Sequence, residues 1–251
     1  MLHAFSRTEL AIGPEGIQAM RNSTVAVLGI GGVGSIAAEA LARTGIGTIL
    51  LIDKDVVDIT NINRQVHALT TTVGQPKADL MRDRIKLINP DCNAIALRMF
   101  YTEETYEQLF AYPLDYVMDA SDTIAYKIHL IKQCLERGIP VISSMGAANK
   151  MDPSRFRITD ISKTHTDPIA KVVRRELRKV GIKKGVKVVF SDEEPRKPRA
   201  DVTQQIVPEK APAIRKAKHP PASNAFVPPV AGLIMVSEIV KDLLVAKTDF
   251  E

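Results

Sequence analysis

Short apolar runs alternate with amphipathic stretches up to about residue 145, and this alternation predicts buried strands separated by helices. Runs that are apolar at almost every position are typical of strands buried on both faces, as in parallel sheets covered by helices on both sides. Helical patterns extend from Lys77 to about Ile88 and over Ile124–Arg137. The predicted strands are Val25–Leu28, Thr48–Ile52, Tyr116–Met118 and Val141–Ser144. We therefore expect an α/β fold with a doubly wound, Rossmann-like, mostly parallel sheet.

The pattern changes in the last third of the chain. Asp167-Pro168 signals a helix start, and apolar residues at 169, 173, 177 and 180 give this helix one packing face. A strand is predicted over Val186–Phe190, and Ser191–Pro221 is a loop too polar to pack well. Val230–Val245 is apolar on most sides, which is typical of a buried helix.

The length of 251 residues, with 45% hydrophobic content, is sufficient for a full-sized core. We expect a Rossmann-like domain over residues 1–165, a basic helix with a flexible loop over 166–222, and a helix over 223–251 that packs on the core or at a subunit interface. No apolar run reaches the roughly 18 residues of a membrane span, and the amino-terminal sequence lacks a signal-peptide core. A cytoplasmic protein without stable membrane insertion is expected.

Four glycines follow the first predicted strand, at Gly29, Gly31, Gly32 and Gly34. Such a strand, turn and helix form a cradle for phosphate, because the free N–H groups at the helix start attract negative charge. Asp53 ends the next strand, where a carboxylate can bind ribose hydroxyls. This pattern also occurs in dehydrogenases, flavoproteins and methyltransferases, so a nicotinamide-binding protein is one alternative.

Polar and cationic residues follow the second strand, at the edge where open α/β sheets bind ligands. An arginine and amide donors can neutralise and orient the outer phosphates of a triphosphate, which the uncharged end of a nicotinamide dinucleotide does not require. Lys77, at the start of a helix, can reach the same phosphates, although a solvated first-turn lysine is the simpler alternative. The residues concerned are Asp55, Asn61, Arg64, Gln65 and Lys77.

Two acids follow the third strand, at Asp119 and Asp122. Magnesium usually takes one or two protein carboxylates together with phosphate oxygens and water, so one or both can hold Mg²⁺. The alternative is that Asp122 caps the helix that follows.

These motifs, in this order and spacing, resemble the ubiquitin-activating-enzyme-like adenylating superfamily from about Ser6 to Gly146. The resemblance implies that Asp53 binds the ribose of ATP and that Asp122 binds magnesium. It also implies a homodimer in which Arg7 of a partner subunit points toward the phosphates; Thr8 replaces the usual glutamine, so an exposed terminal arginine is the alternative. The implied nucleotide site is Gly29, Gly31, Gly32, Gly34, Asp53, Asp55, Asn61, Arg64, Gln65 and Lys77, with Arg64, Lys77, Asp122 and Arg7 as the catalytic set.

The two cysteines argue against a structural zinc site and against a cysteine thioester, both of which relatives in this superfamily use. Cys92 precedes a strand and Cys134 lies within a predicted helix, so both are expected to be small core residues rather than nucleophiles or zinc ligands. Of the five histidines, His67 alone is expected near the site.

Positive charge is concentrated in the last third of the chain. Between Lys171 and Lys218, fifteen Lys and Arg oppose six Asp and Glu, although the net charge of the whole chain is +5. This imbalance suggests a polyanionic partner, either nucleic acid or a membrane surface. A solvated helix followed by a flexible surface loop is an equal alternative from charge alone. The candidate contact residues on the basic helix are Lys171, Arg174, Arg175, Arg178 and Lys179.

Further motifs narrow the resemblance to the tRNA threonylcarbamoyladenosine dehydratase branch of the superfamily. They are Leu41–Gly47, Ile88–Asp91, Ile158–Thr164, Asp167-Pro168 and the basic helix. The resemblance implies ATP- and Mg²⁺-dependent activation of the threonyl carboxylate in a tRNA bearing threonylcarbamoyladenosine, followed by closure of a hydantoin ring. A monovalent cation and a sulfur-transfer partner protein are also implied, without residues assigned to either.

This sequence departs from the branch in two places. Asn149-Lys150 replaces a glycine-rich stretch, and Lys197–Ala222 has no counterpart that can be aligned. Two alternatives therefore stay open: an adenylyltransferase that activates the carboxyl-terminal glycine of a sulfur-carrier or ubiquitin-like protein, and a nicotinamide-linked oxidoreductase.

Overall fold

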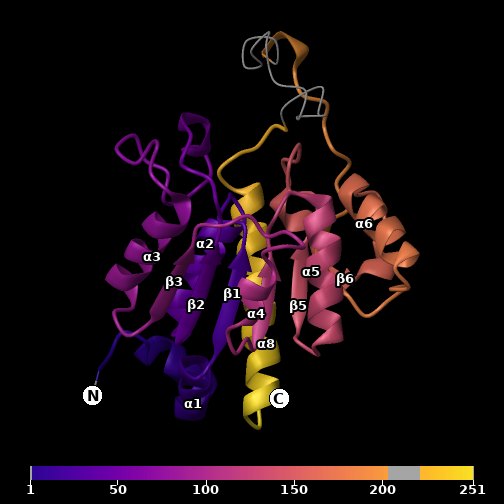
Figure 1. The fold of residues 1–251 in the computed structure, drawn as a ribbon. Coiled ribbons are helices and arrows are strands. Elements are labelled where there is room, and N and C mark those ends of the chain that lie inside the picture. Colours follow the sequence, from indigo (N-terminus) through magenta and orange to yellow (C-terminus); the bar gives the residue numbers. More distant parts are fainter. Residues whose placement is uncertain (1, 203–220, 251) are drawn as a thin grey trace.

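The computed structural model describes residues 2–202 and 221–250, which form a seven-stranded sheet flanked by helices (Figure 1). The strand order is β3-β2-β1-β4-β5-β7-β6, and all neighbours are parallel except the pair β6 and β7. The predicted α/β fold is confirmed. The strands are β1 Thr24–Leu28, β2 Thr48–Ile52, β3 Asn93–Leu97, β4 Tyr116–Asp119, β5 Val141–Ser144, β6 Phe156–Asp160 and β7 Lys187–Ser191.

The helices at residues 34–44, 77–88, 124–136, 168–179 and 227–247 were predicted from the sequence, whereas those at 6–21 and 107–110 were not. The observed helices are α1 Ser6–Arg21, α2 Gly34–Thr44, α3 Lys77–Ile88, α4 Glu107–Phe110, α5 Ile124–Glu136, α6 Pro168–Lys179 and α8 Val227–Lys247. The last of these begins earlier than predicted. Pro228 and Pro229 fall in its first turn, where no intrahelical N–H donor is needed.

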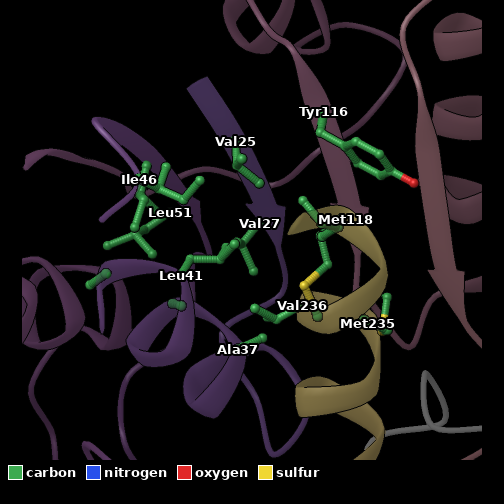
Figure 2. Close-up of a cluster of buried hydrophobic side chains, with 14 of the residues drawn as sticks. Val25, Val27, Ala37, Leu41, Ile46, Leu51, Tyr116, Met118, Met235 and Val236 are labelled. Atoms are coloured by element: carbon green, nitrogen blue, oxygen red, sulfur yellow. The ribbon is translucent and has the colours of Figure 1, made fainter. Parts of the chain in front are cut away.

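Successive residues of β1 pack into different layers. Val25 and Val27 belong to a core shared with α1, α2, α3 and α8, whereas Ala26 and Leu28 belong to a second core shared with α4 and α5. Figure 2 shows the first core, with Val236 of α8 beside Val27 and Met118. The strand is therefore buried on both faces, as its uniform apolarity predicts.

Helix α8 packs on the core and crosses α2 closely. A Cβ atom on Gly232 would lie 2.4 Å from the carbonyl oxygen of Val33. In the carboxyl-terminal half of α8, Asp242 accepts a hydrogen bond from the Tyr116 hydroxyl over 2.7 Å. The same carboxylate pairs with Lys187 over 2.6 Å. Among the helices that the structure describes, α8 included, none has the length and apolarity for a membrane span.

The segment after residue 165 contributes to the same sheet rather than forming a separate appendage. Strand β7 lies between β5 and β6, so the boundary predicted at residues 165 and 166 does not coincide with an edge of the sheet. Val180, predicted on the packing face of α6, is 45% exposed because the helix ends at Lys179, and Ala170 is buried instead. Most of the predicted loop Ser191–Pro221 lies outside the described residues.

A buried ion pair connects β4 to α5 at the carboxyl edge of the sheet. The Lys127 ammonium lies 2.9 Å from a carboxylate oxygen of Asp119, and both side chains are almost completely buried. Ser143 of β5 donates to the same oxygen over 2.6 Å, and the Ser121 hydroxyl donates to the other over 2.7 Å. Asp119 is therefore held in place by side chains from α5, β5 and the loop after β4.

Lys127→Met tests this pair. Removal of the ammonium leaves the Asp119 carboxylate buried without its charge partner, so the free energy of unfolding should fall by about 3–5 kcal/mol in urea denaturation. The control is Lys132→Met, which removes an exposed ion pair to Glu136 on the same helix and should cost less than about 1 kcal/mol. Equal losses in the two variants would contradict a structural role for the buried pair.

Candidate functional site

The strand order reverses at β1, which has β2 on one side and β4 on the other. In open α/β sheets such a reversal leaves a crevice at the carboxyl ends of the strands, and ligands bind there. The glycine turn lies in this position. The Gly29 amide donates to Ile52 of β2 over 2.9 Å, and a Cβ on Gly29 would lie 2.8 Å from the Ala120 carbonyl oxygen after β4. Gly29 also has a φ of +88°, which favours glycine.

The remaining glycines of the turn face different surroundings. A Cβ on Gly34 would collide with the Gly29 carbonyl oxygen at 1.9 Å, and one on Gly32 would lie 3.1 Å from Pro228. A Cβ on Gly31 would meet no atom of the described part of the chain within 4 Å. Gly29 and Gly34 are thus required by the fold of the turn, whereas Gly31 faces open space at the start of α2.

Asp53 connects the end of β2 to the glycine turn. One carboxylate oxygen accepts the Ile30 amide over 2.7 Å, and the other accepts the Asp55 amide over 2.8 Å. Burial raises the pKa of Asp53, while the two amides and the Lys77 charge oppose the rise. Because each oxygen has two lone pairs, both can accept a further hydrogen bond from a ligand hydroxyl.

Arg64 packs against the turn from the loop after β2. Its stem lies 3.2 Å from the position of a Cβ on Gly32, and its guanidinium donates to the Thr60 carbonyl over 2.9 Å. Partial burial lowers the pKa of Arg64. Asn61 is buried and shapes this loop, since its side chain accepts the Asp58 amide over 3.1 Å. Its backbone carbonyl in turn accepts the amides of Arg64 and the next residue.

Lys77 is buried, which is contrary to the alternative of a solvated first-turn lysine. Only 7% of the residue is exposed, and its ammonium lies 3.5 Å from Asp55. The Lys77 amide also donates to the Asp55 carbonyl over 3.0 Å. The first turn of α3 is therefore anchored beside the loop that carries Asp53.

Two buried side chains in the same loop have polar atoms without partners among residues 2–202 and 221–250. They are Gln65 through Oε1 and His67 through both ring nitrogens. Burial, followed by the charges of Lys77 and Arg84, lowers the pKa of His67 to about 4, so its ring is neutral at pH 7. An unpaired buried polar atom costs about 1–3 kcal/mol, and such atoms are typical of ligand or water sites.

The two acids after β4 have different surroundings. Asp119 is enclosed by its partners, so its carboxylate is not accessible to a metal ion. Asp122 is exposed, and it does not cap α5, because Thr123 occupies the N-cap position and no side chain caps that helix. Capping by Asp122, the alternative left open by the sequence, is therefore wrong. Asp122 lies two residues after Ala120, whose carbonyl oxygen would be 2.8 Å from a Cβ on Gly29, and its role as a Mg²⁺ ligand stays a prediction.

Arg7 lies far from this crevice within its own chain. It is exposed near the start of α1, two residues after Phe5, and a Cβ on Gly45 at the opposite end of α2 would lie 3.7 Å from the Phe5 ring. Eleven residues of helix separate Gly45 from the glycine turn. Arg7 therefore requires a second copy of the chain to reach the phosphates, and its role stays a prediction.

The cysteines are core residues. Burial raises the pKa of Cys92 to about 11 and that of Cys134 to about 12, so neither is a thiolate at neutral pH.

The basic residues of α6 are not equivalent. Arg174 is half-buried and donates to the Thr164 carbonyl over 2.7 Å. Arg175 and Lys179 are exposed and pair with Glu176. Lys171 and Arg178 are also exposed, so α6 presents four cationic side chains to solvent.

Comparisons with known proteins agree with this geometry. The ThiF family model matches residues 5–250. The chain is 71% identical over 244 residues to the tRNA threonylcarbamoyladenosine dehydratase of Bacillus subtilis, covering 97% of this chain and 96% of that protein. It is 42% identical to the Escherichia coli enzyme of the same name, over 79% and 77% of the two chains. The crystal structure of an E. coli tRNA N6-threonylcarbamoyladenosine dehydratase with ATP superimposes with a TM-score of 0.85 at 35% identity, over 97% and 94% of the two chains.

Gly31→Ala and Gly34→Ala form a matched pair. A methyl group on Gly31 fills only open space, so the free energy of unfolding should change by less than about 0.5 kcal/mol while ATP affinity falls roughly tenfold. A methyl group on Gly34 should lower the free energy of unfolding by about 1–3 kcal/mol, because it overlaps the Gly29 carbonyl. Urea denaturation and titration calorimetry with Mg-ATP measure the two quantities. Unchanged ATP affinity in Gly31→Ala would show that phosphate binds elsewhere.

Proposed function

We propose that this chain, which belongs to the ThiF family, catalyses the ATP-dependent dehydration of N6-threonylcarbamoyladenosine in tRNA to its cyclic hydantoin form. The principal support is the 71% identity over almost the whole length to a tRNA threonylcarbamoyladenosine dehydratase. The crevice adds independent support, since an open glycine turn, the Asp53 carboxylate and the side chains of Arg64 and Lys77 lie around it.

In the first step, the threonyl carboxylate attacks the α-phosphorus of ATP and pyrophosphate leaves. The carboxylate is ionised at neutral pH and needs no general base, so the protein contributes positioning and charge neutralisation. Asp53 accepts the ribose hydroxyls, and the amides beside Gly31 at the start of α2 donate to phosphate. Arg64 and Lys77 neutralise the charge that develops on the leaving pyrophosphate.

In the second step, the carbamoyl nitrogen of the same nucleoside attacks the acyl-adenylate carbon, and AMP leaves. A C–N bond closes the hydantoin ring, the C–O bond to AMP breaks, and the nitrogen gives up its proton to solvent. The nucleophile belongs to the substrate, which is consistent with the inert cysteines of this chain.

The proposal also includes groups that the chain binds. Asp122 would hold Mg²⁺, which would supply positive charge to the phosphates when bound. A second copy of the chain supplies Arg7, and tRNA lies on the exposed cations of α6. The proposed site of the activity is the cytoplasm. A monovalent cation and a sulfur-transfer partner, implied by the resemblance, have no assigned residue within 2–202 and 221–250.

Asp122→Ala and Arg64→Ala test the adenylation site. Each should lower formation of the cyclic nucleoside about a hundredfold or more, because each removes charge stabilisation from the transition state. The measurements are pyrophosphate release and mass spectrometry of tRNA nucleosides, prepared under mild conditions that preserve the ring.

Asp91→Ala is the control, since Asp91 is an exposed acid at the amino edge of the sheet and its loss should have no effect. Pyrophosphate release that depends on a sulfur-carrier protein instead of tRNA would favour the alternative function. Wild-type enzyme that forms no cyclic nucleoside would disprove the proposal.

Charge reversal on α6 tests the proposed RNA surface. Arg175→Glu/Arg178→Glu should weaken tRNA binding roughly tenfold and reduce the slope of log K against log salt by about 1–2, because fewer counterions are released. ATP affinity should stay unchanged. Lys86→Glu/Lys132→Glu makes the same change of charge on α3 and α5, and it should have a smaller effect in filter binding. Equal effects of the two pairs would assign the attraction to net charge alone.

A further inference from the structure

Residues Ala222–Pro228, here called the strap, lie across the carboxyl edge of the sheet. At one end, the strap is bound to the loop after β5. The Ala222 amide donates to the Asn149 side chain over 2.8 Å, and the Asn149 amide donates back to the Ala222 carbonyl over 2.8 Å. The Asn224 side chain donates to the Lys150 carbonyl over 2.9 Å. The strap is therefore fixed where residues 145–150 leave the sheet.

The strap also contacts the candidate nucleotide site, through Ser223 near its start and through Pro228 at its end. The Asn63 side chain donates to the Ser223 carbonyl over 3.0 Å. Pro228 lies 3.1 Å from the position of a Cβ on Gly32, and Arg64 lies 3.2 Å from the same point. The end of the strap and the arginine stem thus cover the same side of the glycine turn.

The strap has few donors left for a phosphate. The amides of Phe226 and Val227 both donate to the Asn224 side chain, over 3.2 and 2.8 Å. Pro228 and Pro229, which follow in the first turn of α8, have no N–H group. The start of α8 therefore lacks the free amides that make other helix starts anion sites.

An exposed aromatic ring is the main recognition group that the strap presents. Phe226 is 42% exposed, whereas the adjacent Val227 is completely buried. Exposed aromatic rings on RNA-binding proteins can stack on unpaired bases, because every base has a face that stacks. The basic block predicted from the sequence precedes the strap directly in the chain.

We infer that the Phe226 ring stacks on an unpaired base of the RNA substrate and so holds the reacting nucleoside beside Gly31 and Arg64. This inference rests on the proposed function, since it assigns to the same site a contact with the RNA. It makes Phe226 a substrate-binding residue, distinct from the electrostatic contacts of α6.

Phe226→Trp provides a direct test, because the chain contains no tryptophan and the new indole is the single one. Addition of an anticodon stem-loop RNA bearing threonylcarbamoyladenosine should quench its fluorescence through stacking. Leu87→Trp is the matched control on an 88% exposed residue at the far end of α3, and its fluorescence should not change. A fully base-paired RNA of equal length should leave the fluorescence of Phe226→Trp unchanged.

Kinetics test the same contact. Phe226→Ala and Phe226→Leu should raise the KM for the modified RNA about tenfold with kcat and ATP affinity nearly unchanged, whereas Phe226→Tyr and Phe226→Trp should retain the wild-type KM. Phe226→Leu preserves an apolar side chain at the start of α8, so a folding defect cannot account for its effect if its thermal unfolding matches wild type.

RNA that binds without quenching Phe226→Trp, or an unchanged KM in Phe226→Leu, would overturn the stacking contact and leave the proposed function standing. Wild-type enzyme that makes no cyclic nucleoside would overturn both.

Discussion

The contact between the Gly34 backbone and the Gly29 carbonyl is the constraint on which the site depends. Any side chain at Gly34 would overlap that oxygen, and any at Gly29 would meet the Ala120 carbonyl. Because only glycine permits both approaches, α2 starts directly above β1, and the loop after β4 closes against the turn. Asp53 can then accept the Ile30 amide, and Gly31 is left facing open space.

Two buried ion pairs near this turn stabilise the fold. Asp119 is matched by Lys127, and Lys150 pairs with Asp167 over 2.8 Å while donating to the Gly146 carbonyl over 2.7 Å. Lys150 thus accounts for the departure from a glycine-rich stretch, since its buried ammonium joins the loop after β5 to the start of α6. Asp122, exposed and not engaged in capping, is left available for a ligand.

The local elements were predictable because each is encoded by neighbouring residues. Uniform apolar runs predicted β2 and β5 with their observed bounds, and the periodicity after Lys77 predicted α3. Edge strand β6 was not predicted as a strand, since it is only partly buried and lacks a continuous apolar run. The packing face of α6 was misjudged at Val180, because the end of a helix is less well defined by periodicity than its middle.

The sequence alone determined the α/β fold, the glycine turn after β1 and the identity of the polar groups around it, because glycine spacing and apolar periodicity are local. Tertiary structure decided which of these groups are accessible. It buried Asp119 and Lys77, engaged Arg174 with Thr164, and brought Ser223 to Asn63 from 160 positions away. Such contacts depend on how strands are ordered and how α8 crosses α2, and no local pattern in the chain records that order.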